Sequence, residues 1–188
     1  MISDIIQSVS PMSAASLVAI ENLIEYREYE KGVNFIERNK RNTKEYFVID
    51  GICKSYLLNP DGENITISFF IQHSILSPYT TRTIKGVSTL NFQALTPVKL
   101  AELDASAFEN LMVENLEIRE FGNTVLRREL NRKVDKEISL ASLTAKERLL
   151  KFREQYPLLE NQISHLDIAT YLGITNISLS RLRRDLIR

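Results

Sequence analysis

Hydrophobic positions follow two different periods along this chain. In the first 24 residues and beyond residue 104 they recur every three or four positions, which predicts helices over about 11–24, 105–113 and 116–140 and after Thr144 and Ser164. In between, β-branched and aromatic runs predict short strands at about 33–36, 46–49, 52–58, 65–71, 89–94 and 98–103. The pattern therefore predicts an α+β fold.

Turn residues separate the predicted strands. Asp50-Gly51 and the run Asn59-Pro-Asp-Gly62 are the clearest signals, and the second should join its two flanking runs as a hairpin. Many short strands without helices between them favour a β-roll or jelly roll. Ser10 and Pro11 predict the start of the first helix, because serine caps helices and proline suits the first helical position.

The predicted helix over 116–140 is the longest element. Seven apolar residues recur along it at spacings of three and four: Ile118, Phe121, Val125, Leu126, Leu130, Val134 and Ile138. A helix of about 25 residues is nearly 40 Å long, more than a small domain needs, so we expect it to pair with a second copy of the chain. The alternative is a helix that packs against its own domain alone.

The residues after Ile163 have the pattern of a helix-turn-helix. Ser164 and, upstream, Thr144 open helices as N-caps, with an acidic residue three positions later. Gly173 interrupts the first helix of the motif, and Thr175 can cap the second. The second helix is basic, with Arg181, Arg183, Arg184 and Arg188. A basic second helix is typical of DNA binding, and the alternative is an ordinary helical hairpin with a solvated charged face.

Charge is unevenly distributed in this chain of zero formal net charge. Residues 1–118 carry 10 Lys and Arg against 15 Asp and Glu, whereas residues 119–188 carry 14 against 9, which favours a polyanionic partner for the C-terminal third. The single cysteine, Cys53, excludes an internal disulfide and a cysteine-ligated iron–sulfur cluster. We expect a cytoplasmic protein without a membrane partner, because the chain has neither a signal-peptide pattern nor an apolar run of about 20 residues.

The order of elements and the run Asp167-Ile-Ala-Thr-Tyr-Leu-Gly-Ile-Thr-Asn-Ile-Ser-Leu-Ser-Arg181-Leu resemble the Crp/Fnr family of bacterial transcription regulators. The family's roll is matched by Tyr46-Phe-Val-Ile-Asp-Gly51-Ile, and the short form resembles members common in Bacteroidetes-type genomes. The resemblance implies a cyclic-nucleotide-binding-like β-roll over 1–114, a dimerisation helix over 115–141 and a helix-turn-helix domain over 142–188. It further implies a homodimer on a partly palindromic operator in double-stranded DNA, and a contact with RNA polymerase.

The same resemblance assigns six residues to the DNA interface: Thr175, Asn176, Ser178, Ser180, Arg181 and Arg184. Arg181 matches the arginine that this family uses at or near DNA, where its fork suits a guanine edge or a phosphate. The hydroxyl residues Thr175, Ser178 and Ser180 suit phosphate oxygens. Ile177 stands where well-known family members have an acidic residue, so we expect a different operator sequence. Its side chain can contact a thymine methyl or pack internally.

The roll departs from the family's cyclic-nucleotide cassette, in which a Gly-Glu pair is followed by an arginine. Gln72-His73-Ser74 and Ser88-Thr89 stand near the expected pair and the expected arginine, so we expect no response to cyclic AMP in the usual mode. Candidate ligands of an unidentified small-molecule effector are Gln72, His73, Tyr79 and Arg82. The run Tyr79-Thr80-Thr81-Arg82 is otherwise an ordinary polar loop.

Two classes of function remain open. The preferred one is a dimeric, sequence-specific DNA-binding regulator, and the alternative is a small-molecule sensor module that acts through protein contacts. The sequence has no Ser/His/Asp constellation and no phosphate-binding glycine loop, and the roll's single histidine, His73, is too few for a cupin metal site. We therefore predict no enzyme, no cofactor, and no catalytic or metal-binding residue.

Overall fold

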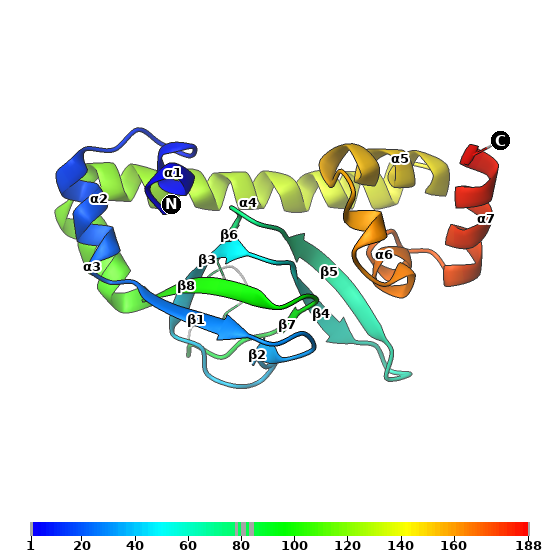
Figure 1. Cartoon of the computed structure of the whole chain (residues 1–188), viewed down its shortest axis with the longest axis horizontal. Coiled ribbons are helices and arrows are strands. Elements are labelled where there is room, and N and C mark those ends of the chain that lie inside the picture. The colour runs from blue at the N-terminus through cyan, green and yellow to red at the C-terminus, as the bar shows by residue number, and fades with distance from the viewer. Residues whose placement is uncertain (1, 78, 80–81, 83–84, 188) are drawn as a thin grey trace. The chain divides into compact units, whose positions relative to one another are not determined.

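The computed structural model describes residues 2–77, 79, 82 and 85–187. The fold is α+β, as predicted, with two N-terminal helices, a β-roll, one long helix and a C-terminal group of helices in chain order (Figure 1). The elements are α1 (Ile2–Gln7), α2 (Ala14–Glu21), β1 (Glu25–Tyr29), β2 (Asn34–Ile36), β3 (Lys44–Asp50), β4 (Cys53–Leu58), β5 (Asn64–Phe70), β6 (Ile75–Leu76), β7 (Asn91–Ala94), β8 (Val98–Asp104), α3 (Ala105–Glu114), α4 (Leu116–Ser142), α5 (Ala145–Gln155), α6 (His165–Tyr171) and α7 (Asn176–Ile187), with a 3-10 turn at Leu159–Asn161.

Two four-stranded sheets form the roll. One has the strand order β1-β8-β3-β6 and the other the order β2-β7-β4-β5. In the first sheet β8 is antiparallel to both neighbours, so that Ala101 lies opposite Tyr26 of β1 and Phe47 of β3. In the second sheet β4 and β5 are neighbours joined at Asn59–Gly62, where the Gly62 amide donates to the Asn59 carbonyl at 3.0 Å. The predicted hairpin is therefore confirmed.

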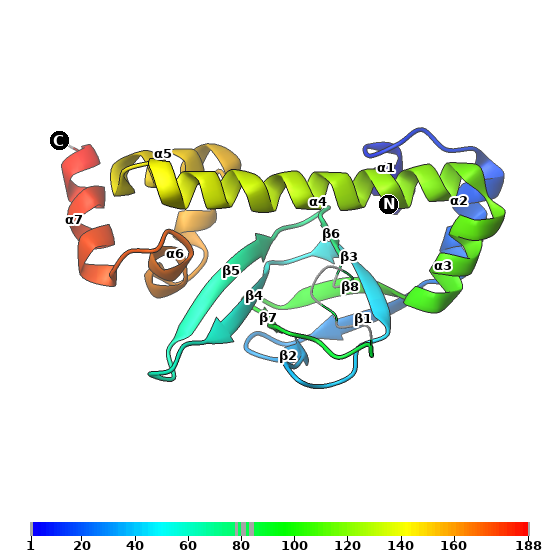
Figure 2. The same ribbon diagram turned by 180° about the vertical axis from the view of Figure 1, so that it is seen from behind.

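The first sheet has one face toward the roll interior and one toward helices. Side chains alternate along a strand, so Tyr46 and Val48 of β3 lie in the interior core while Phe47 lies in a second, outer core. The outer core joins the sheet to α1, α2 and the first part of α4, which lie side by side in both views (Figure 2). The Phe47 ring stacks on Phe121 of α4 with centroids 6.5 Å apart.

Aromatic rings fill the interior of the roll. Phe35 contacts Tyr46 and Phe92, with ring centroids 5.7 and 6.3 Å apart, and Phe70 lies 6.0 Å from Phe92. Tyr46, Phe70 and Phe92 are all at least 95% buried. Such offset and edge-on pairs add stabilisation to the burial of apolar area. Aromatic side chains of the two sheets therefore contact one another in the roll interior.

The N-terminus differs from the prediction of one helix over about 11–24. Helix α2 begins at Ala14 and is capped by Ser13, whose side chain accepts from the Ser16 amide. Residues before it are held out of the helix by Gln7, which donates to the Met12 carbonyl at 2.9 Å and accepts from the Met12 amide at 3.2 Å. The predicted cap at Ser10 is therefore wrong, and α1, β1 and β6 were not predicted at all.

Contacts divide the chain into two compact units. One contains Met1–Ser55 and Phe69–Leu130, and the other contains Tyr56–Ser68 and Asn131–Arg188. The first unit holds the outer core, and the second holds the C-terminal helices with the tip of the β4–β5 hairpin. The domain boundaries expected from the sequence stay a prediction. In the described part of the chain, no helix combines the length and the apolarity that a bilayer crossing requires.

Candidate nucleic-acid interface

Local signals in the sequence build the helix-turn-helix of α6 and α7. Ser164 caps α6, because its hydroxyl accepts from the Asp167 amide at 3.1 Å. Gly173 ends the first helix with a φ of +67°, a left-handed conformation that glycine adopts without the cost of a Cβ. Thr175 caps α7 by accepting from the Ser178 amide at 3.1 Å. All three features confirm the predicted motif.

The two helices of the motif pack through the predicted apolar positions. Ile168, Ala169 and Leu172 of the first helix and Leu179 of the second are at least 97% buried. The fully buried Ala169 gives α6 and α7 room for a close approach. This packing leaves the opposite side of α7 facing solvent.

The solvent-facing side of α7 carries most of the residues predicted to contact DNA. Asn176, Ser180, Arg181 and Arg184 are exposed, and they stand on the same side of the helix at spacings of one, three and four. Thr175 is exposed just before them, whereas Ser178 is half-buried, with its hydroxyl 2.9 Å from that of Thr175. The arrangement offers two guanidinium groups and several polar side chains to a partner.

Arg183 lies apart from this group, although the sequence makes it one of the basic residues of the helix. Its Nε is 2.8 Å from Oε1 of Glu160, and its guanidinium also contacts His165. Glu160 also binds Arg153 through Nε at 2.7 Å. Burial alone would raise the pKa of Glu160, but the hydrogen bond and charge of Arg153, followed by the charge of Arg183, hold it below its usual value. Arg183 therefore links α7 to Glu160 and His165 within the second compact unit. Arg188 lies outside the described residues.

A further arginine, Arg148 of α5, stabilises the motif by hydrogen bonds to carbonyls at the ends of two helices. It was not identified from the sequence. Its Nε donates to the Leu172 carbonyl at 2.9 Å and its Nη1 to the Leu143 carbonyl at 2.7 Å. The guanidinium thereby satisfies carbonyls at the ends of two helices, which have no partner within their helix. Nothing in the spacing of the sequence distinguishes this arginine from its solvated neighbours.

Ile177 is 66% exposed, on the same side of α7 as Arg181 and Arg184. Of the two roles left open for it, internal packing is therefore wrong. A branched apolar side chain on a polar face suits an apolar group of the partner, such as the C5-methyl of thymine.

The effector candidates of the roll do not gather at one place. Gln72 and His73 are exposed on the turn between β5 and β6, where the His73 amide donates to the Val48 carbonyl at 2.8 Å. Tyr79 lines a cavity of about 280 Å³ that neither Gln72 nor His73 lines. Thr80 and Thr81 lie outside the described residues. Among the described residues, no group of three His, Cys, Asp or Glu side chains could hold a metal ion.

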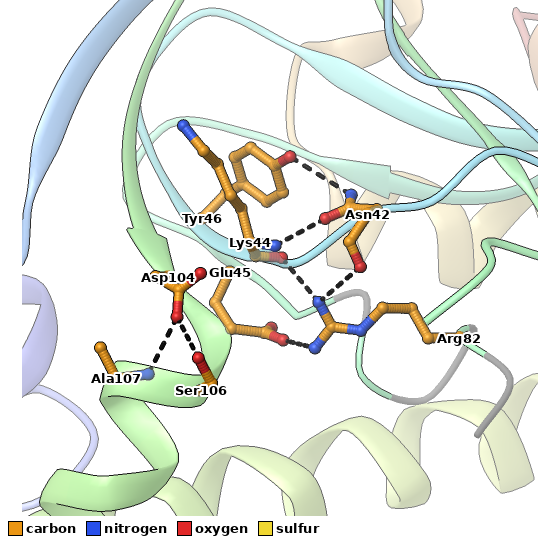
Figure 3. Close-up of polar contacts among 8 residues, drawn as sticks. All are labelled: Asn42, Lys44, Glu45, Tyr46, Arg82, Asp104, Ser106 and Ala107. Carbon is orange, nitrogen blue, oxygen red and sulfur yellow. Dashed lines mark hydrogen bonds and ion pairs between the residues drawn. The ribbon is translucent and has the colours of Figure 1, made fainter. Parts of the chain in front are cut away.

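Arg82 is buried and engaged inside the protein (Figure 3). Its Nη2 pairs with Glu45, and its Nη1 donates to the carbonyls of Asn42 and Lys44 at 3.4 and 3.1 Å. The guanidinium is therefore held by β3 and the residues just before it. A ligand anion would have to compete with Glu45 for this group.

Comparison with known proteins gives consistent matches. Residues 26–115 match the family model of the cyclic nucleotide-binding domain. The nitrogen fixation regulation protein FixK of Bradyrhizobium diazoefficiens is 24% identical over 183 residues, covering 92% of this chain and 76% of the relative.

Solved structures share the fold over most of both chains. FixK2 from Bradyrhizobium japonicum superposes with a TM-score of 0.74 at 22% identity, over 87% of this chain and 84% of that one. A Eubacterium rectale protein assigned to the Crp/Fnr family gives 0.71 at 17% identity, over 92% and 82%. The chain therefore carries a cyclic nucleotide-binding domain, is similar in sequence to a FixK regulator, and shares its fold with proteins of the Crp/Fnr family.

Proposed function

We propose that this chain is a Crp/Fnr-type transcription regulator that binds a partly palindromic DNA operator as a homodimer, with α7 of each copy in the major groove. The proposal rests on the exposed side of α7, which presents Ile177, Ser180, Arg181 and Arg184 together. Arginine forks suit guanine edges and phosphates, hydroxyls suit phosphates, and an exposed isoleucine suits a thymine methyl. The net positive charge of residues 119–188 favours approach to DNA.

The second half of α4 supports self-pairing. Leu130, Val134 and Ile138 are 63%, 44% and 55% exposed, and they follow one another at a spacing of four. A row of apolar side chains that remain about half exposed is typical of the seam between two helices. A symmetric pair through this row would present two recognition helices to half-sites about 34 Å apart.

The roll supports a regulator that does not respond to cyclic AMP in the usual mode. Ser88, near the position where the family's arginine is expected, is fully buried and donates its hydroxyl to the Leu90 carbonyl at 2.7 Å. The aromatic core around Phe35, Phe70 and Phe92 fills the interior of the roll. Among the described residues near this position, a nucleotide phosphate would meet the buried hydroxyl of Ser88 in place of an arginine, so calorimetry with cyclic AMP should show no binding.

The DNA proposal is tested by selecting bound sequences from random duplexes and measuring their affinity by fluorescence anisotropy. We expect a palindrome with half-sites one helical turn apart and an affinity that falls steeply with salt. Arg181→Ala should weaken binding by roughly tenfold or more, because one base or phosphate contact of an arginine is lost. Arg27→Ala removes an arginine that is 60% exposed on β1 and should leave the affinity unchanged.

Two results would contradict the proposal. The first is retention of operator affinity in Arg181→Ala. The second is the absence of any selected sequence, which would favour the sensor module that acts through protein contacts. The dimer is tested separately by sedimentation: Val134→Glu should give a monomer, whereas Val18→Glu, at a valine 53% exposed on α2, should leave the dimer intact.

A further inference from the structure

The cavity of about 280 Å³ lies in the first compact unit, against the outer face of the roll's first sheet. Its wall consists mainly of apolar side chains from β3, β8, α3 and α4: Phe47, Leu103, Phe108, Met112, Phe121 and Val125. Four of these residues, Phe47, Leu103, Phe121 and Val125, belong to the outer core, and Tyr46 of the interior core also lines the cavity. A cavity of roughly 150 Å³ holds a benzene-sized molecule, so this one suits a molecule of up to about twice that size.

One wall of the cavity carries a buried carboxylate that is incompletely hydrogen-bonded. The side chain of Glu45 is 13% exposed, and its Oε1 pairs with Arg82 (Figure 3). Its Oε2 is buried and has no hydrogen-bond partner among the described residues. A buried oxygen in this state loses its hydration without replacement, so a hydrogen-bond donor placed in the cavity would be favourable.

Charge determines which donor suits this place. Glu45 and Glu109 both line the cavity, while the guanidinium of Arg82 is held by Glu45 and two backbone carbonyls. Burial raises the pKa of Glu45 above its usual value, and the charge of Glu109 adds to this shift. The charge of Arg82 and the hydrogen bonds of Ser77 and Arg82 to the carboxylate oppose it and favour the ionised form. The two carboxylates of Glu45 and Glu109 outnumber the single guanidinium of Arg82, so the cavity has a net negative electrostatic potential. An anionic ligand is therefore disfavoured, and a cation is favoured.

We propose that this cavity binds a small amphiphilic amine, with its apolar body between β3 and the helices α3 and α4 and its ammonium group donating to Oε2 of Glu45. The wall formed by Phe47, Phe108 and Phe121 suits an aromatic or branched hydrocarbon body, and aromatic faces also attract cations. The ligand class is thus opposite in charge to a nucleotide. As an effector site this inference rests on the regulator function proposed above, but amine binding can be measured without DNA.

The test uses three matched probes on the whole chain: 2-phenylethylamine, 2-phenylethanol and 3-phenylpropionate. Titration followed by protein NMR should give saturable binding of the amine in the millimolar range, with shifts centred on Phe47, Phe108 and Phe121. We expect the amine to bind roughly tenfold more tightly than the carboxylate, since the carboxylate meets Glu45 and Glu109. The alcohol should lie between them, because it retains a donor for Glu45 without a charge.

Two variants and one control assign the effect to this cavity. Glu45→Gln should bring the amine down to the affinity of the alcohol, and Phe108→Trp should weaken all three probes by reducing the volume. Glu28→Gln removes a carboxylate from β1, where Glu28 is 76% exposed, and should change nothing. Glu45→Gln leaves Arg82 without its ion pair, so Phe108→Trp keeps the test decisive if that variant does not fold.

The proposal is overturned by equal affinity of the amine and the carboxylate, by shifts that lie outside the cavity, or by no saturation with any probe. Unchanged amine affinity in Phe108→Trp would equally count against it. None of these outcomes depends on DNA binding. Failure of the amine site is therefore distinguishable from failure of the DNA interface.

Discussion

The stability of the second compact unit should depend on pH through the titration of Lys136 in α4. Its Nζ donates to the Ile67 carbonyl at 2.5 Å and lies 3.9 Å from the centre of the Tyr171 ring. Burial lowers the pKa of Lys136 from 10.5 to about 7, and the charge of Lys133 adds to the shift. The folded chain therefore releases this proton far below the pH at which the unfolded chain does.

Whether stability rises or falls with pH depends on which state, folded or unfolded, binds more protons at that pH. Below pH 7 both states bind the proton, and the full cost of burying the ammonium is present. As pH rises above 7 the unfolded state holds more protons than the folded state, so stability increases. A pKa of about 7 against 10.5 gives a gain of about 1.5 kcal/mol between about pH 7 and about pH 8.5. Above that range the raised pKa values of Cys53 and Tyr46 have the opposite sign, since the unfolded chain loses these protons first.

Lys136→Met should abolish the gain, because methionine has no proton to exchange. The measurement is urea denaturation by circular dichroism at several pH values in this range, with hydrogen exchange of α6 to report on the second unit. Lys146→Met, at an exposed lysine of α5 in the same unit, should keep the wild-type slope. A wild-type slope that is flat or negative, or one that survives in Lys136→Met, would refute the reasoning.

Three further substitutions have expected effects on thermal and urea unfolding. Thr144→Ala should cost about 1 kcal/mol, because it removes the cap of α5, where the Thr144 hydroxyl accepts from the Glu147 amide at 3.3 Å; Thr144→Ser should restore most of it. Gly51→Ala should cost about 2 to 3 kcal/mol, since its φ is +88° and a Cβ would lie 2.4 Å from the Pro97 carbonyl oxygen. Phe152→Ala should cost about 3 to 5 kcal/mol, because the ring is 98% buried, and a loss below 1 kcal/mol would contradict that packing.

The helix-turn-helix could be predicted from the sequence because its signals are local. A cap hydroxyl at Ser164 or Thr175 and a left-handed glycine at Gly173 act on amides within three or four residues, so their spacing alone identifies them. The hairpin at Asn59–Gly62 was predictable for the same reason.

Features set by distant contacts could not be predicted in this way. Strand β1 consists of Glu25-Tyr-Arg-Glu-Tyr29, mostly exposed and without alternating apolar residues, and it is a strand because β8 supplies its hydrogen-bond partners. The start of α2 at Ser13 is held by Glu117 of α4, which accepts from the Ser13 amide and hydroxyl, and the internal role of Arg183 depends on Glu160. For each of these the deciding partner is elsewhere in the chain.

Helix α4 connects the proposed ligand site to the proposed dimer seam through its own covalent structure. Phe121 and Val125 line the cavity, and the exposed row begins five residues later at Leu130. A rotation of the helix where it meets a ligand would also move Leu130, which belongs to the same compact unit as the cavity. An effector acts in this way if it binds two arrangements with different affinity.

Thermodynamic reciprocity provides a strict test of this coupling. The factor by which the amine changes operator affinity must equal the factor by which operator DNA changes amine affinity. Titration of 2-phenylethylamine with and without the operator duplex measures both factors. Unequal factors would show that the two events are not linked in one equilibrium, and factors of one would make the cavity a binding site without regulatory effect.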